Sequence, residues 1–282
     1  MSSSLYVAAS VADAVAALAE RGSAGMPMAG ATWIMRAPLR HEGMEKSYVA
    51  ISAIEELRRI EISDREIVIG ACVTHAELAD ALTSVQQCRA LAQAAGSSAN
   101  PAIRQVATIG GNLCTSAFSA PDLVPALICL GAETEFETAQ GTERVSVERF
   151  LEMRTGMESG WLLLRVIVPR RPVSSAHIRL PLRKAGDYPV AIVSLAVVLG
   201  KGGTVEDARI AVGSVEAVAR RWPGLEAALT GQPLDPHRAA EQAQGLCAEF
   251  VGRDGIDAPG WYRLKVLPSL VRRAVQAVQE PL

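Results

Sequence analysis

Two short turns built from small and polar residues are the parts of this sequence best suited to hold a ligand. They are residues 29–32 (AGAT) and residues 108–112 (TIGGN). Small residues let several backbone N–H groups point inward together and let a ligand oxygen come close to the chain. The side chains of Thr32, Thr108 and Asn112 could add hydrogen bonds. Each turn is therefore a candidate phosphate site, and the alternative for each is an ordinary loop.

Few basic residues lie near either turn, the closest in sequence being Arg36, Arg40 and Arg104. A diphosphate bound here would depend on backbone dipoles more than on ion pairs. The sequence contains neither the GxGxxG fingerprint of Rossmann folds nor the GxxxxGK motif of P-loops. These two nucleotide-binding motifs are thus excluded.

Asp122 is the acidic residue that follows the second turn. It comes directly after Pro121 and before the apolar run 123–130. One interpretation is an acid at a helix N-terminus, where it favours the helix dipole. The other is a carboxylate that accepts hydrogen bonds from a ligand's hydroxyl or ring N–H. The residues alone leave both open.

No set of side chains indicates catalysis or metal binding by this chain itself. The sequence has no GxSxG, no HExxH and no pair of cysteines spaced CxxC. The odd number of cysteines, five at positions 72, 88, 114, 129 and 247, argues against a disulfide framework and predicts buried free thiols. If the chain takes part in chemistry, we expect a bound cofactor to carry it out.

Composition bounds the class of protein. The chain has 282 residues, 49% of them hydrophobic, and a formal net charge of −2. This length suggests about two domains, and the charge argues against nucleic-acid or anionic-membrane binding. No apolar run approaches the ~20 residues of a membrane span. The N-terminal stretch has no basic residue before Arg21, so no secretory signal is predicted and we expect a cytoplasmic protein.

Strands and helices are expected to alternate along the chain. A strand should open it, followed by a helix capped by Ser10, and Thr74 should cap a later helix. An apolar helix near 121–130 and two strands around a hairpin at Gln140-Gly141 come next. A linker is predicted at 168–176, then three antiparallel strands and two or three helices.

Five segments, taken together, carry a family resemblance. They are MAGATWIM, IGACVTHAEL, IRQVATIGGNL followed by PDLVPALICLGA, RLPLRKAGDYPVAIVSLAVVL, and WYRLKVLPSLVRRAV. In this order and spacing the chain resembles the FAD-binding medium subunit of the molybdenum hydroxylases, the family of xanthine dehydrogenase, carbon monoxide dehydrogenase, and nicotine and quinoline dehydrogenases. The match runs over nearly the whole chain.

The resemblance implies a fold and its domain bounds. A PCMH-type FAD-binding domain would cover residues 1–172, as two α+β subdomains of about 1–58 and 59–172. A CO dehydrogenase flavoprotein-like C-terminal domain would cover residues 173–282, with a three-stranded antiparallel sheet and a helical bundle. FAD would lie in the cleft between them.

The resemblance also implies site residues, carried over by position. The diphosphate would be flanked by Ala29, Gly30, Ala31, Thr32 and Trp33, and the opposite wall would be Thr108, Gly110, Gly111 and Asn112. Asp122 would bind near the ribityl chain or the polar edge of the flavin, and Arg179 falls near a basic residue beside it. Asp187 and Tyr188 would approach the isoalloxazine ring, on which Tyr188 could pack.

Three positions depart from the family pattern. Ala31 stands where a second glycine is usual, which matters if that residue needs a positive φ. Trp33 replaces a small or polar residue. The stretch from Asn112 to Asp122 is one residue longer than usual, with Phe118 where a proline often falls.

The function implied is an FAD-carrying electron-transfer subunit of a heterotrimer, assembled as a dimer of heterotrimers. A large partner would hold molybdopterin-molybdenum and hydroxylate a small, N-heteroaromatic substrate, and a small partner would hold two [2Fe-2S] clusters. One alternative is a stand-alone FAD oxidoreductase that uses NAD(P)H, which would need an acid–base residue over the flavin that does not stand out. Another is an assembly or nucleotide-sensing protein whose turns stay empty.

Overall fold

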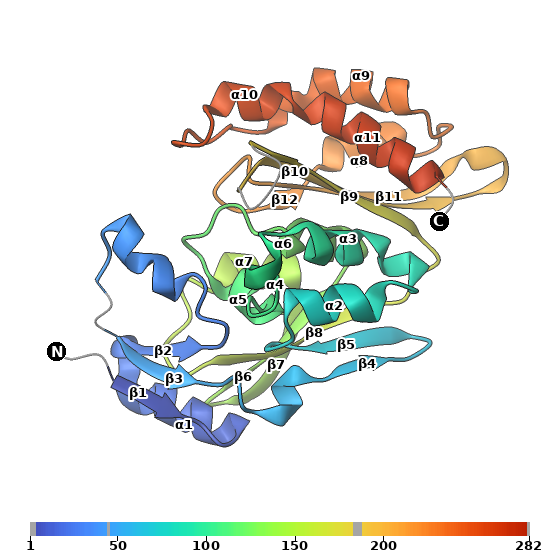
Figure 1. Cartoon of the computed structure of the whole chain (residues 1–282). Coiled ribbons are helices and arrows are strands. Elements are labelled where there is room, and N and C mark those ends of the chain that lie inside the picture. The colour runs from blue at the N-terminus through green and yellow to red at the C-terminus, as the bar shows by residue number, and fades with distance from the viewer. Residues whose placement is uncertain (1–3, 44–45, 183–187, 281–282) are drawn as a thin grey trace. The chain divides into compact units, whose positions relative to one another are not determined.

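The computed structural model describes residues 4–43, 46–182 and 188–280 (Figure 1). The chain divides into two compact units, each assembled from separate stretches of sequence. The first unit comprises Met1–Leu78, Pro101–Ser116 and Ala132–Pro169, and the second comprises Ala79–Asn100, Ala117–Gly131 and Arg170–Leu282.

The first unit begins with a three-stranded parallel sheet in the order β1-β3-β2. Its elements are β1 (Ser4–Val7), α1 (Val11–Arg21), β2 (Gly25–Met28) and β3 (Ser47–Ala50). The side chain of Ser10 accepts a hydrogen bond from the N–H of Asp13 and caps α1, as predicted. Leu18 of α1 packs with Val49 of β3 in one apolar cluster, so the helix covers one face of this sheet.

A five-stranded antiparallel sheet in the order β4-β5-β8-β6-β7 completes the strands of the first unit. The strands are β4 (Ile60–Ile62), β5 (Glu66–Gly70), β6 (Glu133–Thr138), β7 (Gly141–Ser146) and β8 (Leu162–Pro169). Gly141 has a φ of 121° at the β6–β7 hairpin, which is the hairpin predicted at Gln140-Gly141.

Short helices connect these strands. They are α2 (His75–Leu82), α4 (Pro101–Arg104), α5 (Ile109–Cys114), α7 (Val147–Met153) and the 3₁₀ segment η2 (Ile34–Arg40). Thr74 caps α2 as predicted: its hydroxyl accepts from the N–H of Glu77, whose carboxylate accepts from the N–H of Thr74. Thr74 also pairs in an isolated bridge with Thr108, which brings the start of α2 beside the start of α5.

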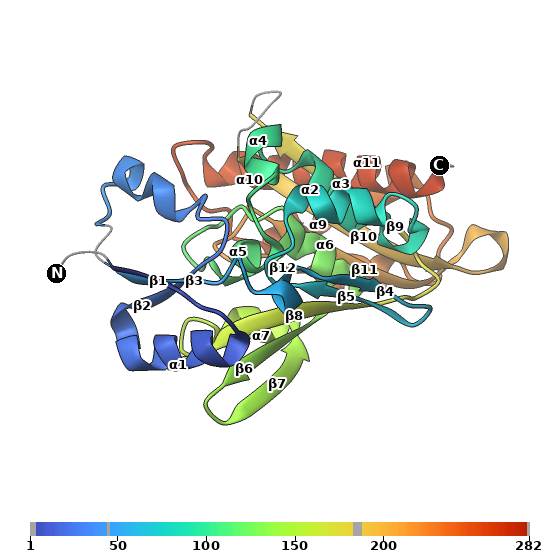
Figure 2. The same cartoon turned by 60° about the horizontal axis from the view of Figure 1, so that its bottom comes forward.

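The second unit is a four-stranded antiparallel sheet, β12-β11-β10-β9, with helices on both faces (Figure 1, Figure 2). The strands are β9 (Ser174–Pro181), β10 (Pro189–Leu199), β11 (Val205–Gly213) and β12 (Arg220–Arg221). The helices are α3 (Arg89–Ser97), α6 (Leu123–Leu130), α8 (Pro223–Leu229), α9 (Pro236–Leu246), α10 (Gly260–Lys265) and α11 (Leu267–Gln279). The three predicted strands are present, and the two-residue β12 extends them by one strand.

Alternation along β10 assigns the two faces of this sheet. Val193 and Leu195 join Trp222 and residues of α8, α9 and α11 in the main apolar core of the unit. The opposite face receives α3 and α6, which come from the sequence before residue 172. None of the described helices is long and apolar enough to cross a membrane.

Candidate functional site

The first predicted turn, which we call the first bend, is residues 29–33 between β2 and η2. Ala31 has a φ of 54°, in the left-handed region where glycine is at ease and alanine is strained. Its carbonyl accepts a hydrogen bond from the N–H of Met35 at 2.9 Å, which starts the turn into η2. The position that departs from the family's usual glycine thus adopts the conformation for which glycine is suited.

Gly30 packs directly against the backbone of Val106 and Ala107, the two residues that precede the second turn. A Cβ built on Gly30 would lie 1.7 Å from the carbonyl oxygen of Val106 and 3.3 Å from the Cα of Ala107. No side chain fits there. The two predicted turns are therefore neighbours within the first unit, although they are far apart in the sequence.

The backbone N–H groups of the first bend are available to a ligand. Among the described residues, no acceptor takes a hydrogen bond from the N–H of Ala29, Gly30, Ala31 or Thr32, and all four are partly exposed. The Thr32 hydroxyl likewise makes no hydrogen bond with the described part of the chain. Polar groups that fold in this way without internal partners are satisfied by water or by a ligand.

Trp33 closes the first bend on the side of η2. The Arg40 guanidinium lies 3.9 Å from the centroid of the indole ring, a cation–π distance. Arg40 also donates to the Trp33 carbonyl at 3.0 Å and pairs with Glu42 at 2.6 Å. Arg40 therefore holds the end of the bend in place through both the ring and the backbone.

The second predicted turn, residues 108–112, is the first turn of α5, and we call it the second bend. Its N–H groups differ from the sequence-based expectation, because those of residues 109–112 all bond within the protein. Those of Ile109 and Gly110 donate to the carbonyls of Val73 and Ala71, at 3.0 and 2.9 Å. Those of Gly111 and Asn112 donate to the hydroxyl and the carbonyl of Thr108, at 3.1 and 3.0 Å.

The second bend packs tightly against the rest of the first unit at Thr108 and Gly110. Thr108 is the N-cap of α5 and is only 5% exposed, so its hydroxyl oxygen serves the helix. A Cβ on Gly110 would lie 2.6 Å from the Ala71 carbonyl oxygen. Gly111 is exposed and Asn112 half-buried, so a ligand could reach the backbone of one and the side chain of the other.

Asp122 lies in the second unit as the N-cap residue of α6, with a side chain that is 7% exposed. It makes no capping hydrogen bond. Its Oδ1 instead accepts from Nε of Arg179 in β9 at 2.8 Å. Its second oxygen, Oδ2, forms no hydrogen bond with the described residues and can accept one from a ligand. Sequence reasoning named both residues but did not pair them.

Tyr188 immediately precedes β10 and is 37% exposed. Its ring centroid lies 5.0 Å from that of Phe118, with the planes tilted by 56°. Phe118, one of the departures from the family pattern, thus braces the tyrosine expected to face the flavin. Asp187 lies outside the described residues.

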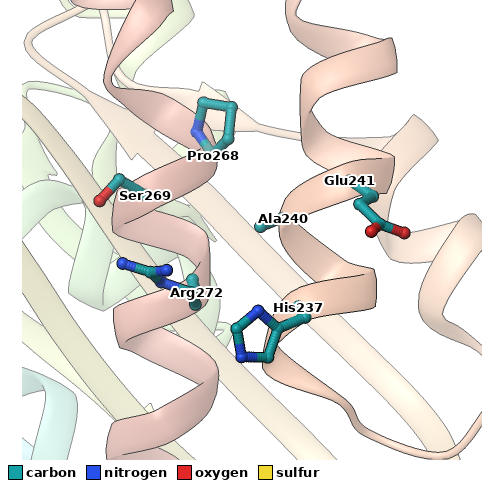
Figure 3. Close-up of a pocket in the computed structure, with 6 residues that line it drawn as sticks. All are labelled: His237, Ala240, Glu241, Pro268, Ser269 and Arg272. Atoms are coloured by element: carbon teal, nitrogen blue, oxygen red, sulfur yellow. The ribbon is translucent and has the colours of Figure 1, made fainter.

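A pocket of about 300 Å³ lies between α9 and α11 of the second unit, and none of the predicted site residues lines it (Figure 3). Its lining residues are His237, Ala240, Glu241, Pro268, Ser269 and Arg272. Among the described residues, no three His, Cys, Asp or Glu side chains gather to hold a metal ion. All five cysteines are free, and burial raises the pKa of the Cys72 thiol to about 12.

These features suit a dinucleotide with paired phosphates. Within the first unit, the first bend supplies unpaired N–H donors and the exposed glycine of the second bend permits close approach. Phosphate oxygens accept hydrogen bonds from backbone N–H groups of this kind without a basic side chain.

Comparison with known proteins identifies the group that fits. Residues 1–171 match the FAD-binding domain of molybdopterin dehydrogenases, and residues 176–278 match the C-terminal domain of CO dehydrogenase flavoproteins. The chain is 30% identical to the 6-hydroxypseudooxynicotine dehydrogenase complex subunit alpha of Paenarthrobacter nicotinovorans, covering 95% of this chain and 92% of that protein. It is 27% identical to the xanthine dehydrogenase FAD-binding subunit of Escherichia coli O157:H7, covering 96% and 94%.

The likeness extends to solved structures. A chain of the CO dehydrogenase from Oligotropha carboxidovorans superimposes with a TM-score of 0.89, at 26% identity, covering 99% of this chain and 98% of that one. Sequence and fold thus agree over the whole length, and both predicted bends fall inside the matched FAD-binding domain. The chain belongs to the FAD-binding medium subunits of the molybdenum hydroxylases, and its cofactor is FAD.

Proposed function

We propose that this chain is the electron-transfer subunit of a molybdenum hydroxylase. In this assembly a small partner with two [2Fe-2S] clusters delivers electrons to the chain, and an external acceptor takes them away. Bound FAD supplies the chemistry of storing two electrons and releasing them. The protein's own part is to bind this cofactor, to orient it, and to leave it accessible both to the partner that donates electrons and to the external acceptor.

The observation that carries the proposal is the set of unpaired N–H groups on the first bend. Ala29, Gly30, Ala31 and Thr32 would donate to the diphosphate, with the Thr32 hydroxyl adding one further donor. The ring of Trp33 would border the same site. A hydrogen bond from a backbone N–H to an anionic oxygen is stronger than a neutral one, so several together can hold a diphosphate without lysine.

The second bend would form the opposite wall through its surface and not through its N–H groups. Thr108 and Gly110 would fix the position of α5, since both are buried and bonded to their neighbours. Gly111 would let the cofactor approach the backbone, and Asn112 would offer its amide side chain.

Residues of the second unit are predicted contacts of the flavin part of FAD, as the family resemblance implies. Asp122 would accept a hydrogen bond through Oδ2 from a ribityl hydroxyl or the polar edge of the flavin. Tyr188, supported by Phe118, would pack on one face of the isoalloxazine ring, contributing about 1 kcal/mol beyond buried area. Asp187 stays a predicted contact in the same segment.

The substrate and partners follow from the family and stay within the proposal. A large partner with molybdopterin-molybdenum would hydroxylate a small N-heteroaromatic compound, a class suggested by relatives named for xanthine and 6-hydroxypseudooxynicotine. The complex would be a cytoplasmic dimer of heterotrimers. Within the chain, residues 1–172 would form the FAD-binding domain, in subdomains of about 1–58 and 59–172, and residues 173–282 the C-terminal domain.

The test is to purify the complex through a tag on this chain and to measure its flavin and its reduction. We expect close to one FAD per chain, reduced by substrate only when both partner subunits are present. The chain without its partners should not oxidise NAD(P)H with an organic substrate. Steady turnover by the isolated chain with pyridine nucleotide would instead support a stand-alone oxidoreductase, and a complex without FAD would contradict the proposal.

A further inference from the structure

A stripe of polar side chains on β9 faces away from the main core of the second unit. Ser175, His177 and Arg179 alternate with Ala176 and Ile178, and alternate residues of a strand share a face. Ser175 donates to the Gln87 carbonyl and accepts from the N–H of Ala90, so it bonds backbone near the start of α3. His177 and Arg179 instead extend toward Asp122, at the N-terminus of α6.

His177 is fully buried, and only one of its two ring nitrogens has a hydrogen-bond partner. Its Nδ1 lies 2.9 Å from the Oγ of Ser194, the residue directly opposite on β10. Its Nε2 has no hydrogen-bond partner among the described residues and lies 3.8 Å from Oδ1 of Asp122. That separation is too long for a hydrogen bond, but it allows an attractive charge–dipole contact between an N–H on Nε2 and the carboxylate.

Chemistry assigns the proton on this ring. If Nδ1 carried it, the lone pair on Nε2 would face a carboxylate, and two acceptors would be buried against each other. If Ser194 donates its hydroxyl to Nδ1, Nε2 carries the proton and directs it at Asp122. The second arrangement gives an attractive contact at both ends, so it is the one that a buried ring would adopt.

We propose that His177 is a positioning residue for Asp122, acting through an N–H on Nε2 that orients the carboxylate beside Arg179. Two donors aimed at Oδ1 fix the rotation of the carboxylate, and Oδ2 is then presented in one direction. This inference rests on the proposed role of Asp122 in binding FAD. It adds a residue that the sequence did not single out and that acts through Asp122.

The matched substitutions His177→Asn and His177→Gln separate the two ring nitrogens. Asparagine reaches the position of Nδ1 and can keep the bond to Ser194, whereas glutamine reaches the position of Nε2 and can donate to Asp122. We expect His177→Asn to raise the FAD dissociation constant of the tagged complex about three- to tenfold, because Asp122 loses one of the two groups that orient it. His177→Gln should stay within about twofold of the unchanged protein.

Coupling to Asp122 distinguishes positioning from a merely structural role. In the Asp122→Asn background, adding His177→Asn should change FAD affinity by less than about twofold, because the oriented group is already gone. Ser175→Ala, on the same stripe but bonded only to backbone, should show no such dependence on the background. Equal losses from His177→Asn in both backgrounds would overturn the inference while leaving FAD binding by Asp122 in place.

A second measurement does not depend on FAD or on the stability of a variant. Nitrogen NMR of the full chain, with the His177 signals assigned by their loss in His177→Asn, reports which ring nitrogen carries the proton. We expect the neutral tautomer with the proton on Nε2. A neutral ring protonated on Nδ1 would overturn the inference whether or not the chain binds FAD.

Discussion

The two bends are made of the same kinds of residue, yet the structure uses them in opposite ways. In the first bend, the N–H groups of residues 29–32 have no partner in the described protein, and a non-glycine residue, Ala31, is held at a φ of 54°. In the second bend, all four N–H groups of residues 109–112 bond within the fold. The first bend offers hydrogen-bond donors to a ligand, and the second bend is part of the packed backbone against which the first bend lies.

The difference shows that a glycine-rich turn has two distinct uses. Gly30 and Gly110 both have carbonyl oxygens where a Cβ would lie, so both are required for packing. What makes the first bend a site is the set of unsatisfied donors next to its glycine. A search for phosphate sites should therefore count unpaired N–H groups before it counts glycines.

The largest effect is expected from Gly30→Ala. The new Cβ would lie 1.7 Å from the Val106 carbonyl oxygen, so the first bend must separate from the chain ahead of the second. We expect FAD affinity to fall about a hundredfold, equivalent to about 3 kcal/mol. Gly43→Ala, where nothing lies within 4 Å of the added Cβ, is the matched control and should bind FAD normally. If the two variants bind FAD with equal affinity, the close contact of Gly30 with Val106 is not required for FAD binding.

The buried thiol of Cys72, next to the residue that bonds the second bend, predicts a pH dependence of stability. Cys72 follows Ala71, whose carbonyl accepts from Gly110, and burial raises its pKa from 9.0 to about 12. The unfolded thiol loses its proton first, so stability is full below pH 9.0 and is lost as pH rises toward 12. Cys72→Ala should reduce this loss of stability by about 1 kcal/mol between about pH 9 and pH 10.

Urea unfolding across this range measures the slope directly. The substitution also changes packing, but that contribution is the same at each pH and cancels in the slope. If the variant and the unchanged chain lose stability in parallel above pH 9.0, the Cys72 thiol is not held protonated by burial.

A crossed pair of isosteric substitutions tests whether the bends divide their roles. Thr108→Val removes the helix cap and should lower the free energy of unfolding by about 1 kcal/mol, with FAD affinity changed by less than about threefold. Thr32→Val removes a hydroxyl without an internal partner and should do the reverse, weakening FAD binding about three- to tenfold at nearly constant stability. Two variants that alter both quantities alike would break the comparison.

The smallest effect is expected at Ala31. Ala31→Gly should relieve the left-handed strain and, after the entropy of the unfolded glycine is subtracted, stabilise the chain by about 0.5 kcal/mol. Ala29→Gly, two residues earlier and without a positive φ, should destabilise by about 0.5–1 kcal/mol. Thermal unfolding of both without FAD checks the signs, and a destabilised Ala31→Gly would mean that the left-handed backbone is not strained.

Local signals in the sequence predicted much of this fold. Ser10, Thr74 and the hairpin at Gln140-Gly141 act as expected because a cap or a tight turn depends on its immediate neighbours. The apolar pattern predicted β9, β10 and β11 because the pattern of a strand is also local in the sequence. The two-residue β12 has too little pattern to be read from sequence.

Contacts between distant segments set the limit of prediction. The second bend was expected to offer its N–H groups to a ligand, but the carbonyls of Val73 and Ala71 accept two of them. No sequence pattern near residue 108 predicts these hydrogen bonds to residues more than 30 positions earlier. Similarly, α3 and α6 belong by sequence to the predicted FAD-binding domain, yet they pack on the C-terminal sheet. The pairing of Asp122 with Arg179 and the position of His177 depend on the same packing.

Amide hydrogen exchange, with and without FAD, tests the division between the bends most directly. We predict that the N–H groups of residues 29–32 exchange rapidly in the chain without FAD and become protected when FAD binds. Those of residues 109–112 should be protected already, with little further change. Slow exchange in the first bend without FAD, or protection gained only in the second bend, would contradict the account.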